Sequence, residues 1–121
     1  MILADTSVWI EHFRRGLPEF AQALSTSRIS IHPIVVGELA TGNLTKRTQT
    51  LAALRRLPTS QIGTFDECLQ FLESRAFYGR GIGWNDLQLL VAARLSGHWL
   101  WSFDSRLAAA ATASGVAYAP S

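Results

Sequence analysis

The chain has 121 residues, 48% of them hydrophobic, with a formal net charge of +2 at pH 7 and one cysteine, Cys68. This length predicts a single domain over residues 1–121, and the lone cysteine excludes an intramolecular disulfide framework. No apolar run reaches the ~20 residues that span a bilayer, and no basic segment leads into a long apolar stretch, so we expect no membrane helix, no signal peptide and a cytoplasmic protein.

Short apolar segments alternate with amphipathic ones along the chain. In chain order we predict a strand at 1–4, helices at 7–15 and 19–26, a strand at 28–31, helices from 33 to 40 or 41 and at 45–57, a brief strand at 60–62, a helix at 65–77, a loop at 79–83, a helix at 85–96, a strand at 98–101, a helix at 105–113 and a last strand at 116–118. The helix at 65–77 places Phe65, Leu69 and Leu72 on one stripe.

This alternation is typical of a parallel sheet covered by helices on both faces. We therefore predict an α/β fold, a three-layer α/β/α sandwich with a central, mostly parallel sheet of four to five short strands. In such sheets, ligands bind beyond the carboxyl ends of the strands. Side chains that follow the strands are accordingly the first candidates for function.

Four of the nine acidic residues occupy apolar junctions or helices. Asp5 and Asp104 each follow an apolar strand, Asp86 begins an apolar helix, and Glu38 lies within one. The parallel arrangement predicts that these acids converge at one rim of the sheet. Carboxylates brought together repel one another unless a cation lies between them, and hard divalent ions prefer oxygen ligands. The pattern indicates a hydrolytic Mg²⁺-type site.

Each acid also has a simpler explanation. Asp5 and Asp104 stand where aspartate commonly caps a helix, and for Asp5 alone the cap is the better supported reading. Asp86 lies near a helix N-terminus, where the dipole favours an anion. Glu38 is harder to explain, because its helical neighbours are apolar and no lysine or arginine lies within four residues. A shared metal ion accounts for all four together.

Two hydroxyl residues lie beside the acids. Ser7 and Ser102 are two positions from Asp5 and Asp104, and we expect their hydroxyls to support the carboxylates from behind. They are poor candidates for nucleophiles, because none of the three histidines stands in a recognisable motif with them.

Together these residues resemble those of the PIN-domain ribonucleases, and most closely the VapC-type toxins of bacterial toxin–antitoxin pairs. The resemblance covers nearly the whole chain. It rests on MILADTSVWI at residues 1–10, on Glu38 in the helix after Pro33, on GWNDLQLL at residues 83–90 and on WSFDSRL at residues 101–107. The hydroxyl residue before the last acid is often threonine in this family and is Ser102 here, which keeps the oxygen.

The resemblance implies an α/β/α sandwich and Mg²⁺- or Mn²⁺-dependent cleavage of RNA that leaves 5′-phosphate and 3′-hydroxyl ends. It assigns metal ligation and catalysis to Asp5, Glu38, Asp86 and Asp104. It further implies a homodimer and an antitoxin that covers the site. The alternative function is a non-catalytic PIN-like interaction protein that binds an antitoxin or RNA without cutting. A phosphatase is disfavoured because the first strand lacks the second aspartate of an Asp-x-Asp nucleophile.

Several arginines and aromatic residues are candidates for contact with RNA or a partner. Arginine supplies ten of the eleven basic residues, a bias that genomic base composition explains as well as phosphate recognition does. Arg80, in the glycine-rich loop, is a candidate phosphate contact, and a solvated loop arginine is the equal alternative. Trp84 is the best candidate for base stacking or partner contact. Trp99 and Trp101 lie in a predicted core strand, where we expect them to pack.

The first predicted helix carries Val8, Trp9 and Phe13, more apolar surface than a short helix needs by itself. One interpretation is that they form part of a groove for a partner's amphipathic helix or strand, with a basic residue of the antitoxin reaching the carboxylates. The other is that all three pack in the protein's own core.

Overall fold

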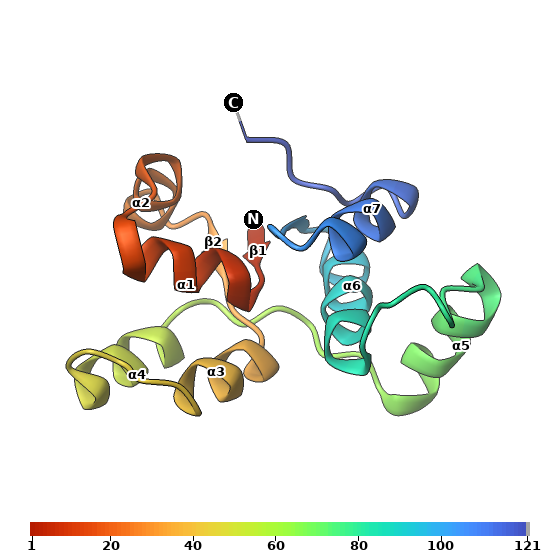
Figure 1. Ribbon diagram of the computed structural model, residues 1–121, viewed down its shortest axis with the longest axis horizontal. Helices are drawn as coiled ribbons and strands as arrows, with labels where there is room; N and C mark the ends of the chain where they lie inside the picture. The colour runs from red at the N-terminus through yellow and green to blue at the C-terminus, as the bar shows by residue number, and fades with distance from the viewer. Residues whose placement is uncertain (121) are drawn as a thin grey trace.

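A small sheet of parallel strands lies at the middle of the structure, a computed structural model in which residues 1–120 are described (Figure 1). Its strands are β1 (Ile2–Ala4), β2 (Ile29–Ser30) and β3 (Trp99–Trp101), in the order β2-β1-β3. In the register, Ile2 pairs with Ile29 on one side and with Trp99 on the other. All three residues of the central strand β1 are buried, as is typical of a strand covered on both faces.

Helices flank this sheet on either side. Figure 1 shows α1 to α4 on the side of β2 and α5 to α7 on the side of β3. The helices of the described residues are α1 (Thr6–Arg15), α2 (Pro18–Ser25), α3 (Pro33–Ala40), α4 (Arg47–Arg55), α5 (Phe65–Arg75), α6 (Trp84–Ser96) and α7 (Ser105–Ala113). The predicted α/β fold is confirmed, and helix α7 has the predicted bounds.

Helix α6 forms part of the core. Six of its residues are buried: Leu87, Leu89, Leu90, Val91, Ala92 and Ala93. A helix that is apolar almost all round is expected to be buried rather than to lie at the surface. Because Asp86 lies in the first turn of this packed helix, its backbone has a fixed position relative to the sheet.

The prediction of four to five strands was wrong for the described residues, which form three. The segments predicted at 60–62 and 116–118 make only isolated parallel bridges, Ile31 with Thr59 and Leu100 with Ala117. Glycine and proline residues flank both segments. These residues favour turns and limit pairing, so neither segment extends the sheet by a full strand.

The stripe predicted on α5 is largely exposed: Phe65 and Leu69 are 64% and 38% exposed, and the helix buries Cys68. One prediction about the packing of β3 was wrong. Trp99 is 51% exposed at the beginning of β3, whereas Trp101 is buried against the rings of Phe20 and Tyr118. The apolar pattern of these segments was therefore read correctly as structured, but not all of it faces the core.

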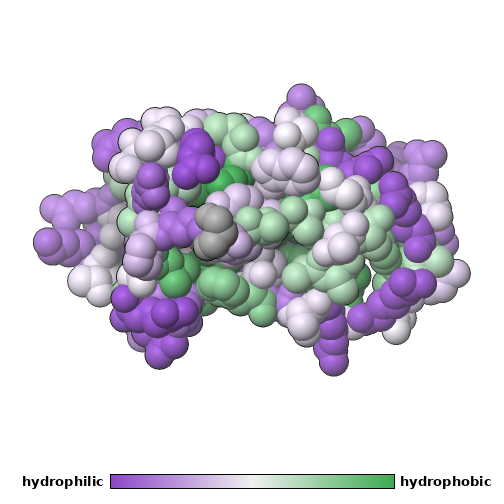
Figure 2. All heavy atoms as spheres, turned by 90° about the horizontal axis from the view of Figure 1, so that it is seen from above, coloured by the Kyte–Doolittle hydropathy of each residue, from purple (hydrophilic) through white to green (hydrophobic). Residues whose placement is uncertain are grey.

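The surface is mixed in character. Figure 2 shows hydrophobic residues through the middle of one face and hydrophilic residues gathered toward its ends. No helix in the described part of the chain is long and apolar enough to cross a membrane.

Candidate active site

Asp5 lies at the end of β1 and is also the N-cap of α1. Its Oδ1 accepts hydrogen bonds from the Ser7 hydroxyl at 2.5 Å and from the Val8 amide at 3.2 Å, and its Oδ2 accepts one from the Ser102 hydroxyl at 2.5 Å. The side chain is 4% exposed. The capping role is therefore real, but it uses only one of several bonds that orient this carboxylate.

The two serine hydroxyls are themselves held in place. The Phe103 amide donates to Ser7 Oγ at 3.0 Å, and the Asp104 amide donates to Ser102 Oγ at 2.9 Å. Each hydroxyl thus directs its own proton to Asp5 while it accepts a backbone N–H. The arrangement joins the beginning of α1 to the segment between β3 and α7, as the position of these serines beside the acids predicted.

Asp104 caps helix α7. Its Oδ1 accepts hydrogen bonds from the amides of Arg106 at 2.9 Å and Leu107 at 3.1 Å. Its Oδ2 accepts no hydrogen bond from the described residues. One oxygen of this exposed carboxylate is therefore occupied by the helix, and the other is available to a ligand.

Glu38 lies on α3 and is exposed, although its neighbours along the helix are apolar. At 100° per residue it falls at the margin of the stripe formed by Val35 and Leu39, which are both buried. The Thr6 hydroxyl donates a 2.6 Å hydrogen bond to its Oε1. Thr6 was not singled out from the sequence, although it directly follows Asp5.

The pKa of Asp86 is affected by the charges of the other three acids. Its pKa is raised to about 6, chiefly by burial and then by the negative charges of Asp5, Asp104 and Glu38. Burial also raises the pKa of Asp5, against the lowering effect of the bonds from Ser102 and Ser7. The four acids predicted from the sequence therefore repel one another across a shared region.

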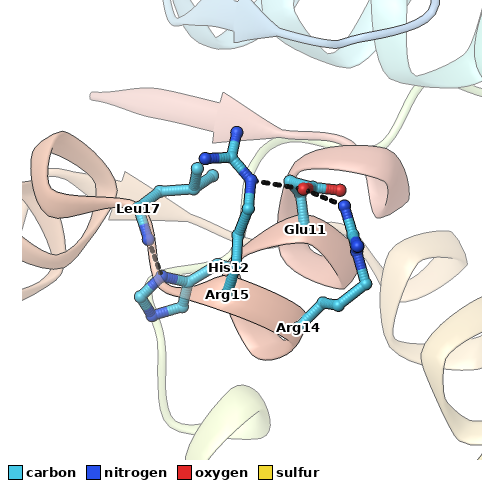
Figure 3. A network of polar contacts seen from close by, with 5 residues as sticks. All are labelled: Glu11, His12, Arg14, Arg15 and Leu17. Carbon is cyan, nitrogen blue, oxygen red and sulfur yellow. Dashed lines mark hydrogen bonds and ion pairs between the residues drawn. The ribbon is translucent and has the colours of Figure 1, made fainter.

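No cation neutralises this region within residues 1–120. The ion pairs there are those of Glu11 with Arg14 and Arg15 at the far end of α1. Figure 3 shows both guanidinium groups turned toward Glu11, beside the His12 ring that accepts a hydrogen bond from the Leu17 amide. The four carboxylates are thus left without a basic side chain close enough to pair with them.

The donor set suits a hard divalent cation. Mg²⁺ prefers oxygen ligands, keeps several waters and takes only one or two carboxylates directly. Within the described chain, no three or more acidic, histidine or cysteine side chains are placed closely enough to hold a metal ion as they stand. What these residues provide is a set of mutually repelling carboxylates around a partly buried one, in which Asp5 and Asp104 each keep a defined orientation.

Comparison with known proteins agrees with this geometry. A family model described as the PIN domain matches residues 2–113, which include all four acids. The chain is also 42% identical over 120 residues to Ribonuclease VapC32 of Mycobacterium tuberculosis strain CDC 1551 / Oshkosh, covering 98% of this chain and 97% of the relative. The VapC32 of strain ATCC 25618 / H37Rv gives the same values. This chain belongs to the PIN-domain family, as a VapC-type ribonuclease.

In this PIN domain the two predicted RNA contacts lie outside the group of acids. Arg80 is exposed, with its guanidinium 5.8 Å from the ring centre of Phe77. Trp84 is the first residue of α6, 39% exposed, with its ring 5.4 Å from that of Phe65. Trp84 was expected in a loop, but its position two residues before Asp86 keeps it near the site.

Of the three apolar α1 residues singled out from the sequence, two pack in the protein's own core and one is available to a partner. Val8 and Trp9 are buried in the core, at 0% and 3% exposure, whereas Phe13 is 46% exposed. Phe13 lines a cavity of about 580 Å³ together with Glu38, and a second of about 350 Å³ beside α4. The cavity that reaches Glu38 is therefore a hollow beside α1 with a mixed lining, in which Arg14 joins Phe13 and Leu39.

Proposed function

We propose that this PIN domain is a divalent-metal-dependent endoribonuclease and the toxin of a toxin–antitoxin pair. The observation that carries the proposal is the Asp86 carboxyl, whose pKa is raised chiefly by burial and then by three neighbouring carboxylates that lack basic partners. A cation bound among these carboxylates would favour the ionised form of Asp86. The relatives named as VapC ribonucleases support RNA as the substrate.

Asp5, Glu38, Asp86 and Asp104 would hold Mg²⁺ or Mn²⁺. When bound, such an ion lowers the pKa of water and stabilises the leaving oxygen of a phosphodiester. Ser7 and Ser102 keep the Asp5 carboxylate oriented, and Thr6 does the same for Glu38. Because the protein's own hydroxyl groups make these bonds, the two carboxylates are oriented by the fold itself.

The same charges control access of the substrate. An RNA phosphate approaching four unneutralised carboxylates is repelled, so productive binding is coupled to loading of the cation. Arg80 and Trp84 supply attraction outside this region, through phosphate contact and base stacking. The protein would act in the cytoplasm on single-stranded or unpaired RNA.

The partner is an antitoxin that occupies the hollow beside α1. The larger cavity is lined by apolar side chains such as Phe13 and Leu39 and reaches Glu38. An amphipathic helix or strand fits such a groove, and a basic residue on it would neutralise the carboxylates in place of the metal. We also propose a homodimer, on the basis of the family resemblance.

Cleavage of labelled RNA with Mg²⁺ or Mn²⁺, and with EDTA, tests the function. Wild type is expected to cut only with metal, Asp86→Asn to lose activity, and Glu73→Gln, an exposed acid on α5, to behave as wild type. RNA or antitoxin binding without metal-dependent cleavage would favour the non-catalytic interaction protein instead.

A further inference from the structure

A third cavity, with basic residues in its lining, lies between segment 77–82 and helix α7. Its volume is about 260 Å³. Phe77 and Ile82 line one side, and the alanines of α7 at positions 109, 110 and 113 line the other. Arg80 and Arg106 both line it as well. It is thus an apolar hollow that exists because α7 carries small side chains here, and it has two guanidinium groups.

These guanidinium groups are free of polar partners. Most arginines in residues 1–120 donate to a carboxylate, a carbonyl or a hydroxyl group. The side chains with neither a hydrogen bond nor an ion pair are those of Arg55, Arg56, Arg80 and Arg106. Of these, Arg80 and Arg106 share the cavity, whereas Arg55 and Arg56 lie at the end of α4.

Gly81 brings the two arginines to the same place. Its φ is +77°, and a Cβ at this position would lie 2.8 Å from Cδ and 2.9 Å from Nη1 of Arg106. Only glycine allows both this backbone conformation and this close approach. The loop that carries Arg80 is therefore packed directly against the Arg106 side chain.

Each arginine of the cavity is close in sequence to one of the four acids. Arg106 follows Asp104 by two positions, so their Cα atoms are at most about 7 Å apart. Arg80 precedes Asp86 by six positions, which limits that separation to about 20 Å. Short chain segments therefore connect the two arginines of the cavity to two of the proposed metal ligands.

We propose that this cavity is a nucleotide subsite for single-stranded RNA beside the bond that is cut. The guanidinium groups of Arg80 and Arg106 bind one backbone phosphate, and the apolar surface formed by Ile82 and the α7 alanines takes the attached base. Planar guanidinium groups match phosphate geometry, and unstacked RNA bases bind apolar and aromatic surfaces. The inference rests on the proposed nuclease function and deepens it by assigning the position of a neighbouring nucleotide.

Chemical protection tests the subsite without relying on catalysis. The wild-type protein is treated with phenylglyoxal, which modifies free arginines, and the peptides containing Arg55, Arg80 and Arg106 are quantified by mass spectrometry. Adenosine 5′-monophosphate, added as the probe, is expected to protect Arg80 and Arg106 and to leave Arg55 reactive. Equal reactivity of all three arginines with and without the probe overturns the proposal.

Variants test the same site with RNA. The affinity for a short single-stranded RNA, measured as the half-saturating concentration in Mg²⁺ cleavage, is expected to weaken roughly tenfold in Arg106→Gln and in Arg80→Gln. The logarithmic salt dependence of binding is expected to fall by about 0.7 when the phosphate contact is lost. Arg106→Lys retains part of the affinity, and Arg55→Gln leaves it unchanged.

The two proposals fail in different ways. If wild type cleaves RNA but Arg80 and Arg106 are neither protected nor needed for affinity, the subsite is wrong and the nuclease function stands. If the probe protects both arginines while no RNA is cleaved, the nuclease function is wrong and the nucleotide site stands. If the variants weaken only binding of a protein partner, the cavity belongs to that interface, which also overturns the subsite.

Discussion

The hydroxyl of Ser102 donates a 2.5 Å hydrogen bond to Oδ2 of Asp5, although the two residues lie 97 positions apart in the chain. The Ser7 hydroxyl donates to the other oxygen of the same carboxylate. One buried acid is thus oriented by two elements that meet only in the folded protein.

Asp5→Asn is expected to abolish cleavage and leave the fold intact. The change removes the charge of a proposed metal ligand but keeps its size and one carbonyl oxygen for the serine hydroxyls. Loss of a metal ligand should lower the rate of RNA cleavage by at least roughly a hundredfold. Gel assays of cleavage and circular dichroism melting would check both parts. Metal-dependent cleavage at the wild-type rate would contradict the assignment of Asp5.

Ser102→Ala is expected to lower the free energy of unfolding by about 1–2 kcal/mol, because it removes a hydrogen bond to a buried carboxylate. It should also reduce cleavage, since Asp5 loses its fixed orientation. Ser102→Thr keeps the hydroxyl and serves as the matched control. Chemical denaturation and initial cleavage rates measure the two effects. If the alanine and threonine variants behave alike, the hydroxyl has no such role.

In the metal-free protein, the contribution of Asp86 to stability is expected to fall as the pH rises from about 4 to 6. The pKa of Asp86 is about 6 when folded, against an ordinary value of 3.8, so the folded state binds the proton more tightly than the unfolded state does. The change should be about 1–2 kcal/mol, since water reaches part of this carboxyl and screens the repulsion. Urea denaturation in EDTA across this range measures it. Asp86→Asn should flatten the profile, and saturating Mg²⁺ should do the same in wild type.

Protonation of His32 is expected to lower the free energy of unfolding as the pH falls below neutrality. Its Nδ1 accepts a 3.0 Å hydrogen bond from the Ile34 amide at the start of α3, and burial lowers its pKa. Its contribution is therefore fully present above the ordinary histidine pKa of about 6.5 and decreases as the pH falls below it. His12 and His98 shift in the same direction, so the difference between wild type and His32→Asn isolates the His32 part. Asparagine keeps a capping oxygen but does not titrate. Parallel pH profiles for the two proteins would contradict this role.

Phe13→Ala is expected to weaken the antitoxin complex roughly tenfold or more and to leave the protein folded, because this ring is half exposed and lines the cavity that reaches Glu38. Phe65→Ala provides the control, since Phe65 is exposed on α5 away from this cavity. Co-purification and titration with the small protein encoded beside this gene measure the effect. Trp9→Ala is unsuitable, because Trp9 is buried and its removal would destabilise the core. Equal binding by wild type and Phe13→Ala would place the interface elsewhere.

The four acids could be grouped from the sequence because parallel strands end at one rim of a sheet. The strand β1 and the helix α6 could be recognised because both are strongly apolar. Helix α7 was predicted with its observed bounds because Asp104 is a good cap and the alanines that follow favour helix. The exposure of Glu38 could not be predicted, since it depends on where α1 lies relative to α3. The approach of Gly81 to Arg106 was equally hidden, because it joins segments that are distant in sequence and carry no motif.

The central position of β1 has a consequence for the order of synthesis. The ribosome makes Asp5 near the beginning of the chain, but the partner strand β3 and the serine that orients this acid emerge only near the end. Contacts of such long sequence separation form late in folding. A nascent chain therefore cannot assemble the four carboxylates until translation of its own message has passed residue 104. On the proposed function, this delay protects the messenger and the ribosome that are producing the toxin.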